Sequence, residues 1–153
     1  MKKEKFSEQK IKIAIAQTDC VLGDLDKNLE THYRHIEQAI DNGQQMIVFP
    51  ELSLTGYSLK DAVYDTALPA DDSRYDKLRD LSRHITIIAG AVELNERFEI
   101  FNSLFCFEDG GLLARHRKVY LPTYGLFEEE RYFSSGERIR AFDSKWGRMG
   151  MLI

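Results

Sequence analysis

The chain is poor in cysteine, and that shortage excludes two classes of protein. Cys20 and Cys106 are the only cysteines among its 153 residues, too few for the disulfide framework of a small secreted domain. Neither belongs to a CxxC pair, and the four histidines form no HExxH motif. We therefore expect a protein of the reducing cytoplasm that holds no structural metal.

Long apolar runs and an excess of basic charge are missing as well. No apolar run approaches the ~20 residues of a membrane span, and no apolar stretch with a small-residue cleavage site follows the charged N-terminus, as it would in a signal peptide. The formal net charge of −4 contrasts with the basic stripe of a nucleic-acid-binding protein. We expect neither a membrane nor a nucleic acid as partner. A hydrophobic content of 43% and a charged content of 30% fit a globular protein with one core.

The first fifty residues predict a β–α–β unit. Ile11–Ala16 alternates isoleucine with lysine or alanine, which predicts a strand packed on both faces. Asp24 or Asp26 can cap a helix that runs to about Asn42. The apolar strand Met46–Phe49 follows, and such a unit implies a parallel strand pair.

The remaining chain predicts one more helix and strand, and then hairpins. The helix is expected over Ser73–His84 and the strand over Ile85–Val92. The paired strands of the two hairpins are Phe98–Phe107 with Leu112–Lys118, and Ile139–Phe142 with Arg148–Ile153. This order of elements predicts an α/β protein with a mixed sheet.

The segment Met46–Tyr57 contains the first candidate for chemistry. Pro50 ends the apolar strand because proline has no N–H for a sheet ladder, and Glu51 follows at once. Glu51 should then lie at the carboxyl end of a strand, where open α/β sheets bind their ligands. Beside Leu52 and Leu54 its carboxylate would be partly desolvated, which suits a general base. An exposed turn glutamate that keeps the loop soluble fits this segment equally well.

The segment Arg115–Phe133 contains the second candidate. Lys118 ends a predicted strand, and Pro122 breaks the chain four residues later. An ammonium group there could turn into a pocket and stabilise an oxyanion, although an exposed lysine at a strand end is the commoner case. Three acids follow at 128–130, and the aromatic residues around them favour burial of at least one. A metal site is disfavoured because no further ligands have suitable spacing.

Taken together, these segments resemble the nitrilase, or carbon–nitrogen hydrolase, superfamily. The opening strand and helix, Phe49–Tyr57, and Arg117–Phe133 match the family in order and spacing. Leu54–Tyr57 and Tyr124–Phe133 are most similar to the glutaminase domain of glutamine-dependent NAD synthetase, whereas Ser58–Asp61 departs from that branch. The resemblance implies a nitrilase-like four-layer α-β-β-α sandwich with mixed sheets, of which this chain covers roughly the N-terminal half.

The resemblance also implies an amidase that cleaves a small carboxamide, such as a glutamine-like one, through a Glu–Lys–Cys triad and a thioester intermediate. Glu51 matches the general base, and Lys118 matches the residue that stabilises the tetrahedral oxyanion. Glu129 matches the second glutamate, which holds the lysine and the base in place. No cofactor is implied. Family members commonly form dimers across a helical face.

Three aromatic residues are candidate walls of the substrate pocket: Tyr57, Tyr124 and Phe127. Aromatic side chains more often fill a core, and that alternative stays open here.

The nucleophile of the triad has no match in the chain. In the family it directly follows a strand that resembles Arg148–Ile153. We therefore expect residues 11–153 to be the N-terminal part of a carbon–nitrogen hydrolase domain, interrupted before a cysteine at the next position, and inactive as it stands. Residues 1–10 are polar and expected to be flexible. The alternative is a catalytically inactive relative that serves as a binding or regulatory subunit. A nucleotide-binding domain is less favoured because neither GxGxxG nor a P-loop follows a strand.

Overall fold

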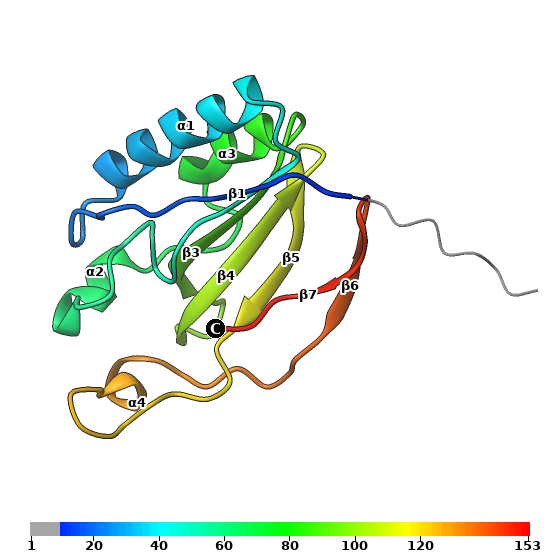
Figure 1. The fold of residues 1–153 in the computed structure, drawn as a ribbon. Coiled ribbons are helices and arrows are strands. Elements are labelled where there is room, and N and C mark those ends of the chain that lie inside the picture. Colours follow the sequence, from blue (N-terminus) through cyan, green and yellow to red (C-terminus); the bar gives the residue numbers. More distant parts are fainter. Residues whose placement is uncertain (1–9) are drawn as a thin grey trace, which may run out of the picture.

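A five-stranded mixed sheet forms the centre of the computed structural model, which describes residues 10–153 (Figure 1). The predicted flexible segment 1–10 lies outside the described residues except for Lys10. The strands are β1 (Ile13–Ile15), β2 (Met46–Val48), β3 (Thr86–Leu94), β4 (Ile100–Glu108), β5 (Gly111–Arg117), β6 (Ala141–Ser144) and β7 (Gly147–Gly150). The helices are α1 (Leu25–Asp41), α2 (Val63–Thr66), α3 (Asp76–Leu81) and α4 (Glu129–Tyr132), with short 3₁₀ turns η1 (Lys60–Ala62) and η2 (Ser73–Tyr75).

The sheet order is β1-β2-β3-β4-β5, and β6 and β7 form a separate hairpin. β1, β2 and β3 run parallel, whereas β4 and β5 are antiparallel to their neighbours. Asp109 and Gly110 turn the β4–β5 hairpin with φ of 50° and 87°, the left-handed conformations that a tight hairpin turn requires. The mixed sheet and both hairpins were predicted from the sequence and are confirmed.

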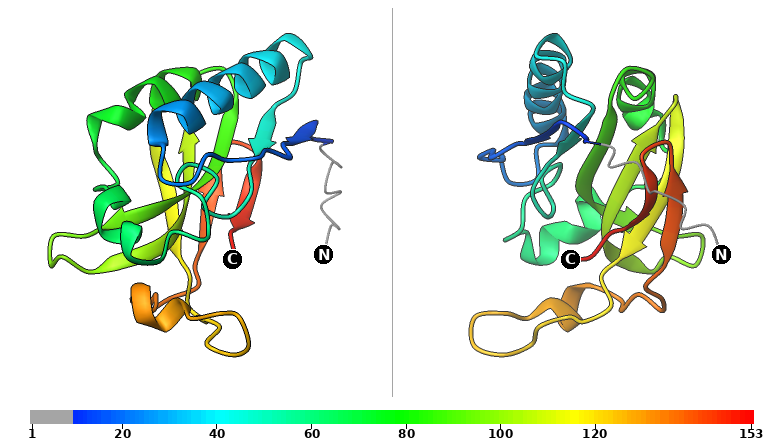
Figure 2. Two further views of the ribbon diagram at one scale, coloured as in Figure 1. Left: turned by 90° about the vertical axis from the view of Figure 1, so that its left-hand side faces the viewer. Right: turned by 45° about the vertical axis from the view of Figure 1, so that its right-hand side comes forward.

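Helices α1 and α3 lie on one face of the sheet, and the β6–β7 hairpin lies on the other (Figure 2). We call these the helix face and the hairpin face. On the helix face, Ile36 of α1 and Leu78 of α3 join a core that contains Ile87, Phe105 and Phe107. The hairpin face packs Leu104 and Cys106 against Trp146 and Met151.

The predicted cap and end of α1 are confirmed. Asp24 accepts a hydrogen bond from the Lys27 N–H at 3.1 Å, and the helix ends at Asp41. Gly43 follows in the left-handed region at φ 66°, which ends helices readily. The side of α1 that carries Leu29 and Ile36 is buried against the sheet.

The prediction that the first strand packs on both faces is wrong. Ala14 and Ala16 pack against the core of the helix face, but Ile13 is 49% exposed and Ile15 84%. β1 is the edge strand, and the residues under the β6–β7 hairpin come from β2 to β5. Alternation of apolar residues locates a strand but does not reveal where in the sheet it lies.

A buried glutamate attaches the β6–β7 hairpin to the sheet. Glu108 accepts hydrogen bonds from Thr86 Oγ1 at 2.8 Å and Ser144 Oγ at 2.7 Å. The Lys145 N–H adds a third bond at 3.0 Å. β7 ends at Gly150 rather than continuing as a strand to Ile153. Within residues 10–153, no helix is both long enough and apolar enough to span a bilayer.

Candidate active site

Glu51 lies in a tight turn directly after β2, as the sequence predicts. The turn rests on β3 at Gly90, where a Cβ atom would approach Leu52 N to 2.4 Å, so only glycine fits. The Leu54 N–H donates to the Gly90 carbonyl at 2.9 Å. Leu52 adopts a φ of 49°, which closes the turn. The Glu51 side chain is 34% exposed, so it is partly withdrawn from water.

Two polar residues of α1 hold this turn from the helix face. Asn28 Nδ2 donates to the Leu54 carbonyl at 3.0 Å, and His32 Nε2 lies 2.9 Å from Ser53 Oγ. His32 Nδ1 lies 2.7 Å from the Asn28 carbonyl, which can only accept, so Nδ1 carries the proton and Nε2 accepts from Ser53. Burial lowers the pKa of His32 to about 4, which keeps the ring neutral. Sequence reasoning missed this pair; its signal is polar residues four apart on the buried side of a helix.

Lys118 is fixed through its main chain at the end of β5. Its N–H donates to the Asn102 carbonyl at 2.8 Å, and its carbonyl accepts from Gly136 N–H at 2.7 Å. A Cβ atom at Gly136 would lie 2.2 Å from the Arg117 carbonyl oxygen, so glycine permits this approach. Lys118 is only 8% exposed. The alternative of an exposed lysine at a strand end is therefore wrong.

Glu129 is the only one of the three consecutive acids that is buried, with 4% exposure. Its N–H donates to the Pro122 carbonyl at 3.1 Å, and its carbonyl accepts from Phe133 N–H at 2.8 Å. The Ser134 N–H in turn donates to the Ile100 carbonyl at the start of β4. These bonds tie the short helix α4 to the end of the sheet and confirm the expected burial.

The three predicted polar residues meet in one ion cluster. Lys118 Nζ donates to Glu51 Oε1 and to Glu129 Oε1, each at 2.9 Å. We call these three residues the acidic cluster, because two carboxylates share one ammonium group. Burial alone would lower the pKa of Lys118, but the hydrogen bonds to Glu129 and Glu51 outweigh it and hold that pKa above its ordinary value.

Among the described residues, each glutamate of the acidic cluster bonds through one carboxylate oxygen, and its other oxygen has no donor. Glu129 Oε2 is buried and accepts no hydrogen bond from residues 10–153. No described residue donates to Glu51 Oε2 either. The Glu51 side chain is 34% exposed, whereas Glu129 Oε2 is buried.

The three predicted pocket aromatics lie together beside this cluster. Tyr57 and Phe127 have ring centroids 6.5 Å apart, and Tyr124 and Phe127 have centroids 5.8 Å apart. They are 39–73% exposed, so the alternative that they fill a core is wrong. Tyr57, Phe127 and Glu129 line a hollow of about 110 Å³. Lys118, Tyr124 and Ile153 line another of about 580 Å³.

Tyr57 also makes a contact that the sequence did not predict. Its hydroxyl donates to Glu129 Oε1 at 2.6 Å. Burial and this hydrogen bond raise the pKa of Tyr57 above its ordinary value, so the hydroxyl stays a donor. Asn102 is a second missed residue: its Nδ2 donates to Glu51 Oε1 at 2.6 Å. Its sequence signal is an amide in a strand, β4, that is otherwise mostly apolar.

A second ion cluster lies on the helix face of the same sheet. Glu93 is fully buried and accepts from Arg115 Nη1 at 2.8 Å and Arg117 Nη2 at 2.5 Å. Its Oε2 accepts from Ser103 Oγ at 2.7 Å. The Arg117 guanidinium lies 3.9 Å from the centroid of the Phe101 ring. We call Glu93, Arg115 and Arg117 the arginine cluster.

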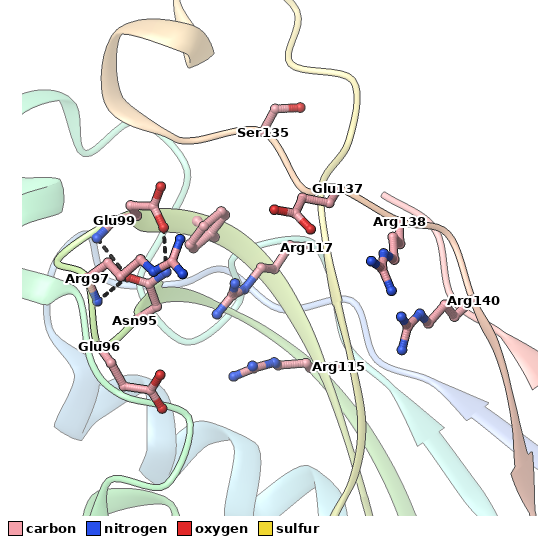
Figure 3. A pocket seen from close by; sticks show the side chains of 11 residues that line it. Asn95, Glu96, Arg97, Glu99, Arg115, Arg117, Ser135, Glu137, Arg138 and Arg140 are labelled. Carbon is pink, nitrogen blue, oxygen red and sulfur yellow. Dashed lines mark hydrogen bonds between the residues drawn. The ribbon is translucent and has the colours of Figure 1, made fainter.

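The arginine cluster borders a wide hollow of about 530 Å³ (Figure 3). Arg138 and Arg140 lie on the side of this hollow away from Arg97, and neither forms an ion pair with any residue of 10–153. Because both Glu93 oxygens are already bonded, this cluster joins β3, β4 and β5 without offering a free carboxylate.

Neither cysteine of the chain is placed for nucleophilic chemistry. Cys106 is fully buried in the hairpin-face core, as predicted, and burial followed by the nearby Glu108 carboxylate raises its pKa to about 12. Cys20 is half-buried, and both thiols are free. Over residues 10–153, no three side chains of His, Cys, Asp or Glu are grouped to hold a metal ion.

The sequence profile described as carbon-nitrogen hydrolase matches residues 12–153. The chain belongs to the carbon–nitrogen hydrolase family. It is 31% identical over 136 residues to the glutamine-dependent NAD(+) synthetase of Thermotoga maritima, covering 86% of this chain and 23% of that protein. The relative from Acinetobacter baylyi is also 31% identical, over 143 residues that make up 93% of this chain and 26% of that protein.

Solved structures show the same fold. The glutamine-dependent NAD+ synthetase of Acinetobacter baumannii superimposes with a TM-score of 0.79 at 30% identity, covering 93% of this chain and 27% of that one. Saccharomyces cerevisiae Nit3, a member of the nitrilase superfamily, gives a TM-score of 0.78 at 29% identity. The match covers 92% of this chain and 54% of Nit3. The predicted family and nitrilase-like α/β fold are therefore confirmed. The chain spans about a quarter of the length of the curated relatives it matches.

Proposed function

We propose that the whole protein hydrolyses a small carboxamide of the glutamine type, with Glu51 as general base, Lys118 as oxyanion stabiliser and Glu129 as the acid that positions Lys118. The observation that carries this proposal is the single ammonium group shared between Glu51 and Glu129 at 2.9 Å each. A base, a cation and an offsetting acid within one cluster are the groups that acyl transfer from an amide requires.

The nucleophile in this proposal is a cysteine thiol at the position after Ile153. Ile153 lines the same hollow as Lys118, which supports a thiol close to the cluster. Glu51 Oε2 takes the thiol proton, and the sulfur attacks the amide carbonyl carbon. Lys118 stabilises the resulting oxyanion. When the C–N bond breaks, the proton passes from Glu51 to the departing ammonia, and water then cleaves the thioester to release the acid.

The proposed substrate follows from the walls of the site. Tyr57, Tyr124 and Phe127 offer aromatic surface beside the cluster, which suits a small polar amide with a short apolar stem. The relatives from Thermotoga and Acinetobacter are glutamine-dependent enzymes by name, and this supports glutamine as the first substrate to test. We further propose a cytoplasmic location, in keeping with two unbridged cysteines, and a homodimer, which rests on the family resemblance alone.

The test is Glu51→Gln in the full-length protein, with ammonia release from glutamine as the readout. The amide keeps the size of the side chain but cannot take a proton, so we expect turnover to fall by at least about 1,000-fold. The melting temperature should change little because the glutamine oxygen can still accept from Lys118 and Asn102, and Lys118 keeps its ion pair with Glu129. Glu37→Gln, on the exposed side of α1, is the matched control and should retain full turnover.

Retained turnover in Glu51→Gln would overturn the role of Glu51 as base. A wild-type protein that releases no ammonia from glutamine or other small amides would instead identify an inactive relative that binds without cleaving.

A further inference from the structure

One buried residue, Asn102, contacts both the proposed base and the proposed cation. Its side chain bonds Glu51, and its main chain bonds the main chain of Lys118. Asn102 lies on β4 and is 1% exposed. Its Nδ2 donates to Glu51 Oε1 at 2.6 Å, while its carbonyl accepts from the Lys118 N–H at 2.8 Å. The side chain shares the hairpin face with Leu104 and Cys106, which alternate with it along the strand.

The orientation of this amide follows from the chemistry of its partner. A carboxylate only accepts hydrogen bonds, so the nitrogen of Asn102 must face Glu51 and the oxygen must point away. That oxygen, Oδ1, is buried and finds no donor among residues 10–153.

An unpaired buried carbonyl destabilises the folded chain, and a leucine of similar shape would avoid this penalty on an apolar strand. The amide provides one thing that leucine cannot, a neutral donor directed at Glu51 at every pH.

We propose that Asn102 is a positioning residue for the base: its amide fixes Glu51 Oε1 and so presents Oε2 to the nucleophile. This inference rests on the proposed amidase function. Lys118 and Asn102 together saturate Oε1, which leaves Oε2 as the oxygen that takes the proton. A hydrogen bond to a carboxylate also favours its ionised form, which is the form a base must have before reaction.

The first test compares Asn102→Leu with Ser103→Ala in the full-length protein. Ser103 is the next residue on β4, is equally buried, and donates to Glu93 on the other face, so it controls for loss of a buried polar group. In Asn102→Leu we expect kcat on glutamine to fall about 10- to 100-fold with KM within about threefold. The acidic limb of the kcat profile should move to higher pH, because the ionised base has lost a donor. Ser103→Ala should show neither change.

Asn102→Asp separates positioning from packing, because it keeps the size of the side chain. When the Asp–Glu pair holds one proton it can still form the hydrogen bond, and when both carboxylates ionise they repel. We therefore expect turnover of this variant to decline as the pH rises through the titration of the pair, a range in which wild-type turnover increases. A residue that only fills space would not reverse the pH dependence.

A readout without turnover completes the test. The Glu51 carboxyl can be titrated by ¹³C NMR in wild type and Asn102→Leu, with Glu51→Gln used to assign its signal. A higher titration midpoint in Asn102→Leu supports the inference, and an unchanged midpoint overturns it. If the wild type cleaves no amide, the proposed function fails, and this titration still decides whether Asn102 holds the Glu51 carboxylate in its ionised form. Should Asn102→Leu not fold, the pH profile and titration of Asn102→Asp decide it.

Discussion

Two ion clusters meet at the end of β5, and they are built with opposite balances of charge. Arg117 and Lys118 are adjacent in the chain, yet Arg117 bonds Glu93 on the helix face and Lys118 bonds Glu51 on the other side. The arginine cluster sets two guanidinium groups on one carboxylate, whereas the acidic cluster sets two carboxylates on one ammonium group.

The two clusters also differ in how fully their hydrogen bonds are satisfied. Both oxygens of Glu93 are bonded, by Arg115, Arg117 and Ser103. In the acidic cluster, one oxygen of each glutamate has no donor among the described residues. A saturated buried cluster fixes strands in place, whereas the carboxylate oxygens without donors in the acidic cluster suit the proposed proton transfer. The contrast predicts that the two clusters respond differently to the same kind of substitution.

The largest difference is expected between Lys118→Met and Arg117→Met in the full-length protein. Lys118→Met removes the cation proposed to face the oxyanion, so turnover on glutamine should drop about 1,000-fold, or roughly 4 kcal/mol of transition-state stabilisation. Arg117→Met should keep turnover within about threefold at 25 °C and lower the melting temperature instead. Equal losses of turnover in both variants would show that the clusters are not functionally distinct.

The next largest effect is expected from lowering the pH, which should destabilise the turn that carries Glu51 before it affects the arginine cluster. His32 holds the Glu51 turn and has a pKa lowered to about 4 by burial. The pKa of His32 in the folded protein lies below its unfolded value of about 6.5, so its contribution to the free energy of unfolding is complete above pH 6.5. That contribution decreases by about 3 kcal/mol as the pH falls toward 4. Hydrogen exchange of the turn 50–56 should therefore accelerate over that range, after correction for intrinsic rates.

The control for this pH effect is His32→Gln, which can still bond Ser53 but does not titrate. Exchange in the turn 50–56 of that variant should lose its excess pH dependence between 6.5 and 4. The segment around Glu93 should behave alike in both proteins. Identical pH dependence in wild type and His32→Gln would show that His32 does not control the turn.

A smaller effect, on stability alone, is expected from Glu93→Gln. The substitution keeps the shape of the side chain but removes the charge that Arg115 and Arg117 share. Both arginines retain access to solvent, at 49% and 22% exposure, so we expect a loss of about 2 kcal/mol rather than the larger penalty of a fully buried unpaired charge. Urea denaturation would measure it, with turnover of the native protein unchanged. A loss of turnover comparable to that of Lys118→Met would contradict the structural role.

Sequence reasoning found the acidic cluster but not the arginine cluster, and the difference has a physical cause. Glu51 and Lys118 stand at strand ends, one directly after Pro50 and the other four residues before Pro122, and the family resemblance grouped them with Glu129. Glu93, Arg115 and Arg117 lie within or at the ends of strands, so their meeting depends on the register between β3, β4 and β5. That register is set by a turn and a bulge near Cys106, which a single sequence does not specify.

The same distinction between local and long-range features explains which parts of the fold were predicted correctly. The N-terminal cap and the end of α1, the parallel β1–β2 pair and the β4–β5 hairpin were all predicted from nearby residues or from the order of elements. The exposure of Ile13 and Ile15 depends on which strands the β6–β7 hairpin covers. The hydrogen bonds of Asn102 and Tyr57 likewise join residues 51 and 72 positions apart, and no periodicity in the sequence encodes them.

The smallest predicted effect tests whether Tyr57 belongs to the acidic cluster or only to the pocket wall. Tyr57→Phe keeps the aromatic contact with Phe127 but removes the donor to Glu129 Oε1. Because Tyr57 is 39% exposed, water can replace that bond in part, and we expect a loss of about 1 kcal/mol, or roughly fivefold in kcat. Tyr64→Phe, on an exposed residue, is the matched control. A change in KM alone would restrict Tyr57 to substrate binding, whereas a change in kcat would show that Glu129 needs two donors to hold Lys118 between the carboxylates.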